Sequence, residues 1–504
     1  MVLAALVGGP TGAAPARDAP PAQAGAGLRP CRLAGVAQAA QCGQLKRPLD
    51  PARPQGLTID LHYAVLPALA RHKAADPVFF FAGGPGQSAI ALAGVFSTRF
   101  ARLGQRRDLV LVDQRGTGRS APLRCDDDSP QARRRPLAEV ASPGARLASL
   151  QACRQALQAL PHGDLRWFGT DTAAADADAV RQALGAAQIN AIGLSYGTRV
   201  VLALMRQYPA TVRRAVLDGV VPPDMRLADV AGRDAQAVLD GLFQACAADQ
   251  ACQRRYPAAA AQFQRLLAGL PETVSLPHPV SGRPETLVLD RDSVLGLVRA
   301  PLYQPALAAA LPAVRAEAEA GRWAPLLALA NPLGGGAASA LATGMHHAVL
   351  CSEDVGPDDA GITAAVEKVA AADALAATAA PAFGDLLARQ YRLACAGWPR
   401  AAPAAAFYTL PPALSPTWLL SGGLDPVTPP QHAQRVAQAL GPMAQHTRVA
   451  QAGHGVTGLA CMADAAARFI SDDDPPARPP WGAACAAGVP RPPVWQAPGP
   501  EAAR

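Results

Sequence analysis

Residues 193–197 read GLSYG, a Gly-x-Ser-x-Gly arrangement with Ser195 at its centre. An apolar run precedes this serine and a helix-like segment follows it. That setting is typical of a nucleophile elbow, a strained strand-to-helix turn that exposes a serine hydroxyl. The chain contains 45 glycines, so the five-residue pattern can also arise by chance. Other parts of the sequence must therefore supply the partners that would make Ser195 a nucleophile.

A serine hydroxyl attacks a carbonyl group at neutral pH when a histidine takes its proton and a carboxylate orients that histidine. After an elbow, the acid precedes the histidine along the chain. Of the nine histidines, His454 stands between two glycines directly after a late strand-like run, and Asp425 in SGGLDPVTP follows the strand-like run before it. We therefore predict a Ser195–Asp425–His454 triad. The alternatives are a structural histidine and a common Asp-Pro turn.

Backbone N–H groups must also stabilise the oxyanion that forms during the attack. One donor is expected to be Tyr196, the residue after the nucleophile. The second is expected in the loop AGGPG at residues 82–86, where glycines let the backbone approach the substrate closely. We select Gly84 as this donor and leave Gly83 open as the alternative. An ordinary turn would use the same residue types.

Regularly spaced apolar runs predict the elements that would hold these residues. Runs without alternation, each ending near glycine or aspartate, occupy residues 77–86, 108–116, 189–197, 213–220, 416–426 and 446–455. Such runs are typical of strands buried on both faces of a parallel sheet. Helix-like segments at 172–185, 198–208 and 429–440 alternate with them, whereas residues 57–65 alternate in polarity like an antiparallel strand. The sequence thus predicts an α/β fold with a mostly parallel central sheet and the chemistry at the carboxyl ends of its strands.

The chain between residues 222 and 410 breaks this rhythm, because it is largely Ala/Leu-rich helical sequence. We interpret 222–410 as an inserted, mainly helical cap that separates the first part of the core, 17–221, from the second part, 411–504, with its Pro-rich tail. Residues 1–16 combine a short apolar stretch with small residues, which suggests a signal-peptide remnant that lacks the usual positive start.

Cysteine usage favours an oxidising compartment. The chain has ten cysteines, an even number, and none lies in a Cys-x-x-Cys metal pattern. Pairing neighbours is the simplest connectivity and would join residues 31 and 42, 125 and 153, 246 and 252, 351 and 395, and 461 and 485. Buried free thiols in a cytosolic protein are the alternative. We expect a secreted or periplasmic protein.

Composition narrows the classes of partner. Half of the residues are hydrophobic and 17% are charged, which is typical of a globular chain. The net charge of +7 is modest for 504 residues, and no Lys/Arg block is interleaved with aromatic residues, so nucleic-acid binding is disfavoured. We find no apolar run long enough to span a bilayer beyond the N-terminal segment. We expect a monomer that acts on peptides and needs no metal and no cofactor.

Six segments together resemble the proline iminopeptidase and tripeptidyl aminopeptidase family of α/β-hydrolases. In order, they read AGGPGQS, DQRGTGRS, GLSYGT, LDGV, SGGLDPVTP and AGHG. The resemblance covers residues 45 to 490, is weakest in the cap, and is closest to the secreted bacterial branch with a TAP-like C-terminal region. Ala82 stands where many relatives have histidine, which favours that branch over small cytosolic proline iminopeptidases.

The resemblance implies an α/β-hydrolase fold and hydrolysis of a peptide bond near a free N-terminus. A protonated amine requires a carboxylate, and relatives carry a Cys-x-Glu-Asp element similar to CSED here. Glu353 is therefore our first candidate for amine binding, with Asp354 beside it; a solvated acidic loop is the alternative. Asp113 and Arg115 are expected to support the loop next to the site. A carboxylesterase on the same scaffold is the competing function, because a fold alone does not select a substrate. A non-catalytic binding module is disfavoured because all three triad positions are filled.

Overall fold

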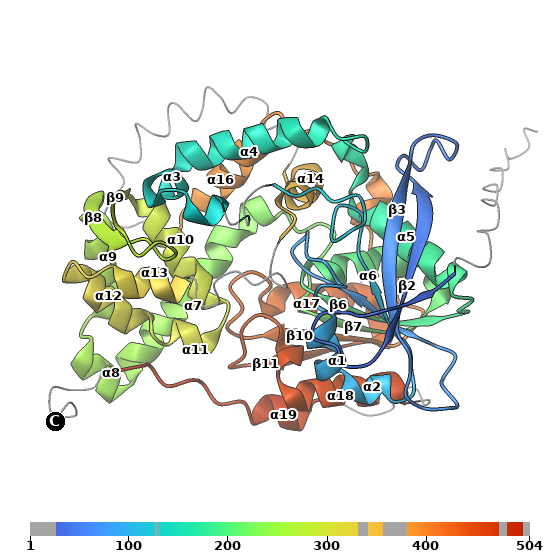
Figure 1. Ribbon diagram of the computed structural model, residues 1–504. Helices are drawn as coiled ribbons and strands as arrows, with labels where there is room; N and C mark the ends of the chain where they lie inside the picture. The colour runs from blue at the N-terminus through green and yellow to red at the C-terminus, as the bar shows by residue number, and fades with distance from the viewer. Residues whose placement is uncertain are drawn as a thin grey trace, which may run out of the picture.

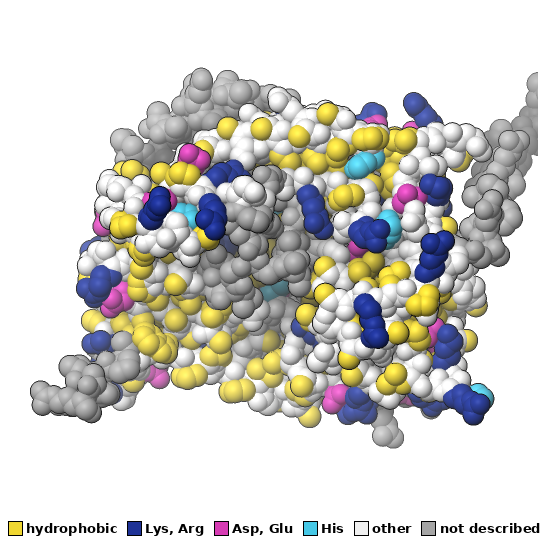
Figure 2. All heavy atoms as spheres, in the orientation of Figure 1, with side chains coloured by type: hydrophobic (Ala, Val, Ile, Leu, Met, Phe, Trp, Pro, Cys, Tyr) yellow, Lys and Arg dark blue, Asp and Glu magenta, His cyan; other side chains and the backbone are white. Residues whose placement is uncertain are grey.

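The computed structural model describes residues 27–125, 129, 131–330, 341–355, 381–472 and 481–496. The expected signal-peptide remnant at 1–16 lies outside these residues. None of the described helices is both long enough and apolar enough to cross a membrane. On the face drawn in Figure 2, Lys and Arg side chains are scattered rather than gathered into one basic patch.

Within the described residues, a nine-stranded mixed sheet forms the centre of the molecule (Figure 1). In spatial order the strands are β1 (Arg29–Cys31), β2 (Ala40–Pro48), β3 (Thr58–Leu66), β5 (Leu109–Val112), β4 (Val78–Phe81), β6 (Ile189–Leu194), β7 (Val212–Asp218), β10 (Thr417–Gly422) and β11 (Ala444–Val449). The strands from β5 to β11 pair in parallel, whereas β1, β2 and β3 are antiparallel to their neighbours. The predictions of a mostly parallel sheet and of an antiparallel strand at 57–65 are both confirmed.

Alternating side chains of the strands bury two faces of this sheet. On β4, Phe79 and Phe81 belong to one hydrophobic core, whereas Val78 and Phe80 belong to the other. The first face is covered by α5 (Thr170–Ala183), α6 (Tyr196–Gln207) and α17 (Pro430–Leu440), and the second by α1 (Ala93–Arg99), α2 (Ala101–Gly104) and α18 (Ala460–Ser471). Because both faces are buried, the parallel strands read as continuous apolar runs.

The chain between β7 and β10 builds a second hydrophobic core, drawn in green and yellow in Figure 1. The described helices between β7 and β10 include α7 (Leu227–Ala248), α8 (Gln250–Arg255), α9 (Ala259–Ala268), α10 (Arg291–Leu302), α11 (Pro305–Ala308), α12 (Leu311–Glu319), α13 (Ala324–Ala330), α14 (Thr343–Glu353) and α16 (Leu386–Cys395). A hairpin of β8 (Glu272–Pro277) and β9 (Pro284–Leu289) interrupts the helices. The expected cap bounds of 222–410 stay a prediction.

Helix α14 departs from a simple cap, because it packs against the main core and not against the second one. Met345, Ala348 and Val349 of this helix belong to the same buried cluster as the sheet residues Phe79 and Leu217. The inserted segment therefore returns to the sheet and brings side chains of α14 next to the loops at the strand ends.

Five disulfides join the ten cysteines, and each joins neighbours in the sequence. The expected connectivity is thus confirmed for every pair. The bond between Cys351 and Cys395 links α14 to α16, and the bond between Cys461 and Cys485 links α18 to α19 (Ala483–Ala487). The crosslinks lie in both the sheet layer and the insertion.

Candidate active site

Ser195 occupies the turn between β6 and α6 with φ of 55° and ψ of −125°. A positive φ is unusual for a residue with a side chain and is the strain expected at a nucleophile elbow. Both flanking glycines are required by close backbone contacts. A Cβ atom on Gly197 would lie 2.1 Å from the carbonyl oxygen of Phe81, and one on Gly193 would lie 2.7 Å from the carbonyl oxygen of Gly197. The local geometry is therefore that of the predicted elbow.

His454 and Asp425 lie side by side beyond the ends of β11 and β10. Nδ1 of His454 lies 2.8 Å from Oδ2 of Asp425. The buried Asp425 carboxylate also accepts hydrogen bonds from the backbone N–H groups of Val427 and Thr428 and from the Thr428 hydroxyl, at 2.9, 2.9 and 2.6 Å. The turn thus holds Oδ1 through two N–H groups, while Oδ2 accepts from both the Thr428 hydroxyl and the imidazole.

The negative charge of Asp425 and the positive charge of protonated His454 stabilise each other. Burial alone would raise the pKa of Asp425, but the attraction and hydrogen bond of His454, together with Thr428, outweigh it and lower that pKa below its ordinary value. Burial alone would lower the pKa of His454, but Asp425 outweighs it, Asp218 adds to the rise, and the net pKa is raised. Arg299 opposes this rise. Asp425 is therefore ionised when His454 must hold a proton.

Asp218 and Gly219 connect the elbow to the histidine loop. The N–H of Ser195 donates to the carbonyl oxygen of Asp218 at 2.8 Å. A Cβ atom on Gly219 would lie 3.2 Å from Cε1 of His454. The buried Asp218 carboxylate accepts hydrogen bonds from the N–H groups of Val456 and Thr457, at 2.9 and 2.7 Å. The end of β7 therefore positions both Ser195 and the loop that carries His454.

The Ser195 hydroxyl makes no hydrogen bond among the residues that the structure describes. Its side chain is half-buried, and the His454 side chain is 15% exposed, so neither is fully enclosed. Catalytic hydrogen bonds of this kind are often long before a substrate binds and tighten in the reacting complex. The three triad candidates are thus brought to one edge of the sheet.

The AGGPG loop lies directly against the elbow. A Cβ atom on Gly83 would lie 3.0 Å from Cβ of Ser195, and Gly84 has a φ of +113° that favours glycine. Tyr196 is the first residue of α6, so its N–H has no acceptor within the helix. Tyr196 follows Ser195 directly and Gly83 lies against it, while no contact of Gly84 with Ser195 is found, so the choice of Gly84 over Gly83 as the second donor stays a prediction.

Two further groups hold this loop. Ala342, just before α14, donates its N–H to the carbonyl oxygen of Gly86 at 2.9 Å, and Nδ1 of His346 lies 3.1 Å from the carbonyl oxygen of Pro85. Burial, together with the neighbouring His347, lowers the pKa of His346 to about 3. A neutral imidazole beside a carbonyl oxygen must donate from Nδ1.

Comparison with protein families and curated proteins agrees with this geometry. Residues 76–306 match the model of the alpha/beta hydrolase fold, and residues 380–485 match that of TAP-like protein. The chain has an α/β-hydrolase fold and a TAP-like C-terminal region. In this fold the acid and the histidine follow the elbow in chain order, as Asp425 and His454 follow Ser195 here.

Two curated proteins are similar to parts of this chain. The chain is 31% identical to the serine protease Hip1 of Mycobacterium tuberculosis over 320 residues, which cover 60% of this chain and 61% of that protein. It is 31% identical to the tripeptidyl aminopeptidase of Streptomyces coelicolor over 196 residues, covering 36% and 35% of the two chains. The chain thus spans about three fifths or less of the length of these relatives.

Two buried charged side chains near the elbow, Asp113 and Arg115, connect neighbouring segments of the core. Asp113 accepts hydrogen bonds from the Ser88 hydroxyl at 2.6 Å and from the N–H of Ile90 at 3.1 Å, both just after the AGGPG loop. Arg115 forms two hydrogen bonds with Asp176, at 2.7 and 3.0 Å. Asp113 thus contacts the segment just after the AGGPG loop, whereas the expected support of this loop by Arg115 stays a prediction.

Glu353 and Asp354 are not placed in an open pocket. Glu353 accepts hydrogen bonds from the N–H and the hydroxyl of Thr170, at 2.7 and 2.8 Å, and both carboxylates pair with Arg199, at 3.2 and 2.8 Å. All three side chains are almost fully buried, and the Thr170 hydroxyl in turn contacts the Tyr196 hydroxyl at 3.0 Å. The alternative of a solvated acidic loop is therefore wrong. The geometry favours support of the elbow over amine binding.

The inserted segment contributes two residues that the sequence analysis did not single out. Tyr303, at the end of α10, accepts the N–H of His454 at its carbonyl oxygen, at 3.0 Å, and its ring meets the imidazole edge-on with centroids 5.5 Å apart. Arg299, one turn earlier, lies over the Tyr303 ring. Neither residue belongs to a motif, and only the fold brings them to His454.

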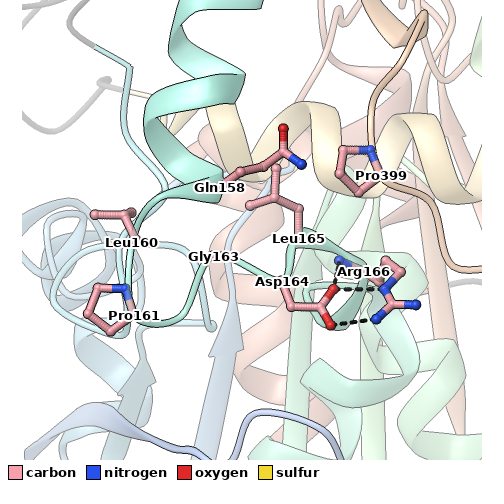
Figure 3. A pocket seen from close by; sticks show the side chains of 8 residues that line it. All are labelled: Gln158, Leu160, Pro161, Gly163, Asp164, Leu165, Arg166 and Pro399. Carbon is pink, nitrogen blue, oxygen red and sulfur yellow. Dashed lines mark hydrogen bonds and ion pairs between the residues drawn. The ribbon is translucent and has the colours of Figure 1, made fainter.

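Figure 3 shows a surface hollow whose lining includes none of the triad residues. It is lined by Gln158, Leu160, Pro161, Gly163, Asp164, Leu165, Arg166 and Pro399. The Asp164 and Arg166 side chains face each other there and form hydrogen bonds at 2.8 and 2.7 Å. Its lining has no histidine and no nucleophile, and its charges are paired, so it does not compete with the triad as a reaction site.

Proposed function

We propose that this chain is a serine peptidase that hydrolyses peptide bonds near a free N-terminus. The observation that carries the proposal is the hydrogen bond between His454 and Asp425 at the strand edge where the strained Ser195 turn meets the glycine loop. The names of the relatives, a serine protease and a tripeptidyl aminopeptidase, support the peptidase class.

In this mechanism Ser195 attacks the carbonyl carbon while Nε2 of His454 takes the hydroxyl proton. Asp425 holds Nδ1 of His454 and stabilises the imidazolium that forms. The N–H groups of Tyr196 and Gly84 donate to the oxyanion. The imidazolium then gives its proton to the leaving amine, and water activated by the same histidine releases the acyl group from Ser195.

Recognition of the free N-terminus is the finer part of the proposal. Glu353 and Asp354 were its expected ligands, and their pairing with Arg199 does not support that role. A carboxylesterase on the same scaffold is therefore the second candidate, because the two carboxylates nominated for amine binding are already paired with Arg199. Secretion or a periplasmic location is also proposed, and the five disulfides support it because such bonds persist in oxidising compartments.

Aminoacyl and tripeptidyl chromogenic amides, each with a free and an acetylated N-terminus, test the function together with simple esters. The proposal expects cleavage of free-amine amides, little cleavage of acetylated ones, and no turnover by Ser195→Ala protein. Equal cleavage of free and acetylated amides would remove the N-terminal specificity. Cleavage of esters alone would support the carboxylesterase.

A further inference from the structure

Arg299 places a positive charge beside the candidate triad. It lies on α10 one turn before Tyr303, with its Cζ atom 5.4 Å from the centre of the Tyr303 ring. Its Nη2 group donates to the Tyr303 hydroxyl at 3.1 Å. Since Tyr303 contacts His454 through both its ring and its carbonyl oxygen, the guanidinium is connected to the imidazole by a single residue.

This guanidinium lacks a carboxylate partner in the part of the chain that the structure describes. The Tyr303 hydroxyl is its hydrogen-bond acceptor there, and its buried Nε atom has no acceptor. A guanidinium has five N–H donors, and a partly buried charge is costly when it is unpaired. Nearby Asp425 does not satisfy it, because the Asp425 oxygens are occupied by its own turn and by His454.

Two other buried arginines near the elbow have carboxylate partners. Arg199 pairs with Glu353 and Asp354, and Arg115 forms two hydrogen bonds with Asp176. Arg299 differs from both because no carboxylate of the described residues pairs with it, so its charge is available to an anion. Arginine binds carboxylates with two parallel hydrogen bonds, so a carboxylate is the group whose shape fits it.

We propose that Arg299 binds a carboxylate of the substrate close to the scissile bond. The proposal rests on the proposed function and names the substrate class within it. Because His454 passes its proton to the leaving amine, a group beside His454 lies near the leaving portion. The expected carboxylate is therefore on the residue after the cut, either as the C-terminal carboxylate of a short peptide or as an acidic side chain.

Binding of this carboxylate would also assist the reaction at His454. The positive charge of Arg299 opposes protonation of the imidazole, as described above. A carboxylate paired with Arg299 cancels part of that charge, so the imidazolium becomes easier to form when the substrate is in place. Arg299 would therefore strengthen the binding of a carboxylated substrate and make proton transfer to His454 easier.

A matched pair of leaving groups tests the proposal. Amides of one acyl group with 4-aminobenzoate and with 4-aminobenzamide differ only in a carboxylate against a neutral carboxamide. We expect wild-type protein to prefer the carboxylated amide in kcat/KM by about tenfold or more, which is the effect of one charge-assisted hydrogen-bond pair. Arg299→Gln should reduce that preference to about twofold or less. Arg299→Lys should retain part of it, since lysine keeps the charge but cannot form the two parallel hydrogen bonds of a guanidinium.

The control is Arg291→Gln, on the same helix two turns earlier, where the side chain donates to the carbonyl oxygen of Ala382. It should retain the wild-type preference. A second substrate pair, with Glu or Gln on the acyl side of the cut, locates the carboxylate. A preference that depends on Arg299 in the leaving-group pair supports the proposal, whereas one confined to the acyl-side pair would contradict the assignment to the residue after the cut. The absence of such a preference in both pairs would overturn it.

A binding measurement separates this proposal from the proposed function. Ser195→Ala protein, with Arg299 intact or replaced by Gln, is titrated calorimetrically with 4-aminobenzoate and with 4-aminobenzamide. Tighter binding of the carboxylate that is lost with Arg299→Gln supports the carboxylate site even if no amide is turned over by the wild type. Equal binding of the two compounds to both proteins would contradict it. Thermal unfolding of each variant shows that the comparison is made on folded protein.

Discussion

His454 donates a hydrogen bond from Nδ1 to Oδ2 of the buried Asp425, at 2.8 Å. Because a carboxylate with a lowered pKa can only accept, the proton of the neutral imidazole is held on Nδ1, and Nε2 is free to accept the proton of Ser195. A single contact thus selects the tautomer that the reaction requires, and the contacts of Thr428 and Asp218 keep both partners in place.

Replacing Ser195 by alanine should abolish turnover while leaving the fold intact. The side chain is half-buried and makes no hydrogen bond among the described residues, so its loss removes the nucleophile without removing a structural contact. We expect kcat to fall by about 10⁴-fold or more, with the thermal unfolding temperature changed little. Retained activity in purified Ser195→Ala protein would exclude this residue as the nucleophile.

The pH dependence of kcat/KM should report His454. Its pKa is raised above the ordinary 6.5 by Asp425 against the effect of burial, and the histidine acts as a base only when it is neutral. Activity should therefore rise with pH through a midpoint above 6.5. Asp425→Asn should move the remaining activity to a lower midpoint, because the stabilising charge is gone. A wild-type midpoint below 6 would contradict the hydrogen-bonded pair.

Thr428→Val should lower kcat/KM although the three triad residues themselves are unchanged. The hydroxyl donates to Asp425 at 2.6 Å and lies 3.1 Å from Nδ1 of His454, so its loss leaves a buried carboxylate short of one donor. We expect kcat/KM to fall about tenfold, the equivalent of ~1.4 kcal/mol. Thr428→Ser, which keeps the hydroxyl, should restore most of the activity. Equal rates for both variants would deny Thr428 this role.

His346→Phe should weaken the oxyanion loop. A neutral His346 donates to the carbonyl oxygen of Pro85, and phenylalanine fills similar space without a donor. Misplacement of the loop should lower kcat by about tenfold with a smaller change in KM. His162→Phe is the control, since that imidazole lies 3.5 Å from the carbonyl oxygen of Pro122, outside the AGGPG loop. If His346→Phe lowers the thermal unfolding temperature but leaves kcat unchanged, this histidine has a structural role only.

Glu353→Gln should reduce stability more than it changes substrate binding. The glutamate side chain is 3% exposed and faces Arg199, so its neutralisation leaves a buried charge less well compensated. We expect unfolding to become easier by about 3 kcal/mol, as is usual when one partner of a buried pair is removed. Exposed Glu139 serves as the control, because Glu139→Gln should cost about 0.5 kcal/mol or less. A selective rise in KM for free-amine substrates, with normal stability, would instead restore amine binding.

The sequence by itself determined the fold class and the elbow of this protein, and its simplest cysteine pairing agrees with the structure. Each of these depends on local patterns: apolar runs mark strands buried on both faces, glycines mark the close approach around Ser195, and cysteines pair with their neighbours along the chain. The order of serine, aspartate and histidine needed no coordinates either, because the chain order follows from the order of the strands.

Tertiary structure alone decided what surrounds the triad. Glu353 lies 154 residues from Arg199 in the sequence and yet pairs with it, which changes the expected amine ligand into a support of the elbow. Arg299 and Tyr303 belong to no recognisable motif, and the packing of α10 against the strand ends places them beside His454. Such side-chain pairs form between segments that are distant in the sequence. The sequence shows that a residue is charged, but only the packing of these segments determines which opposite charge lies next to it.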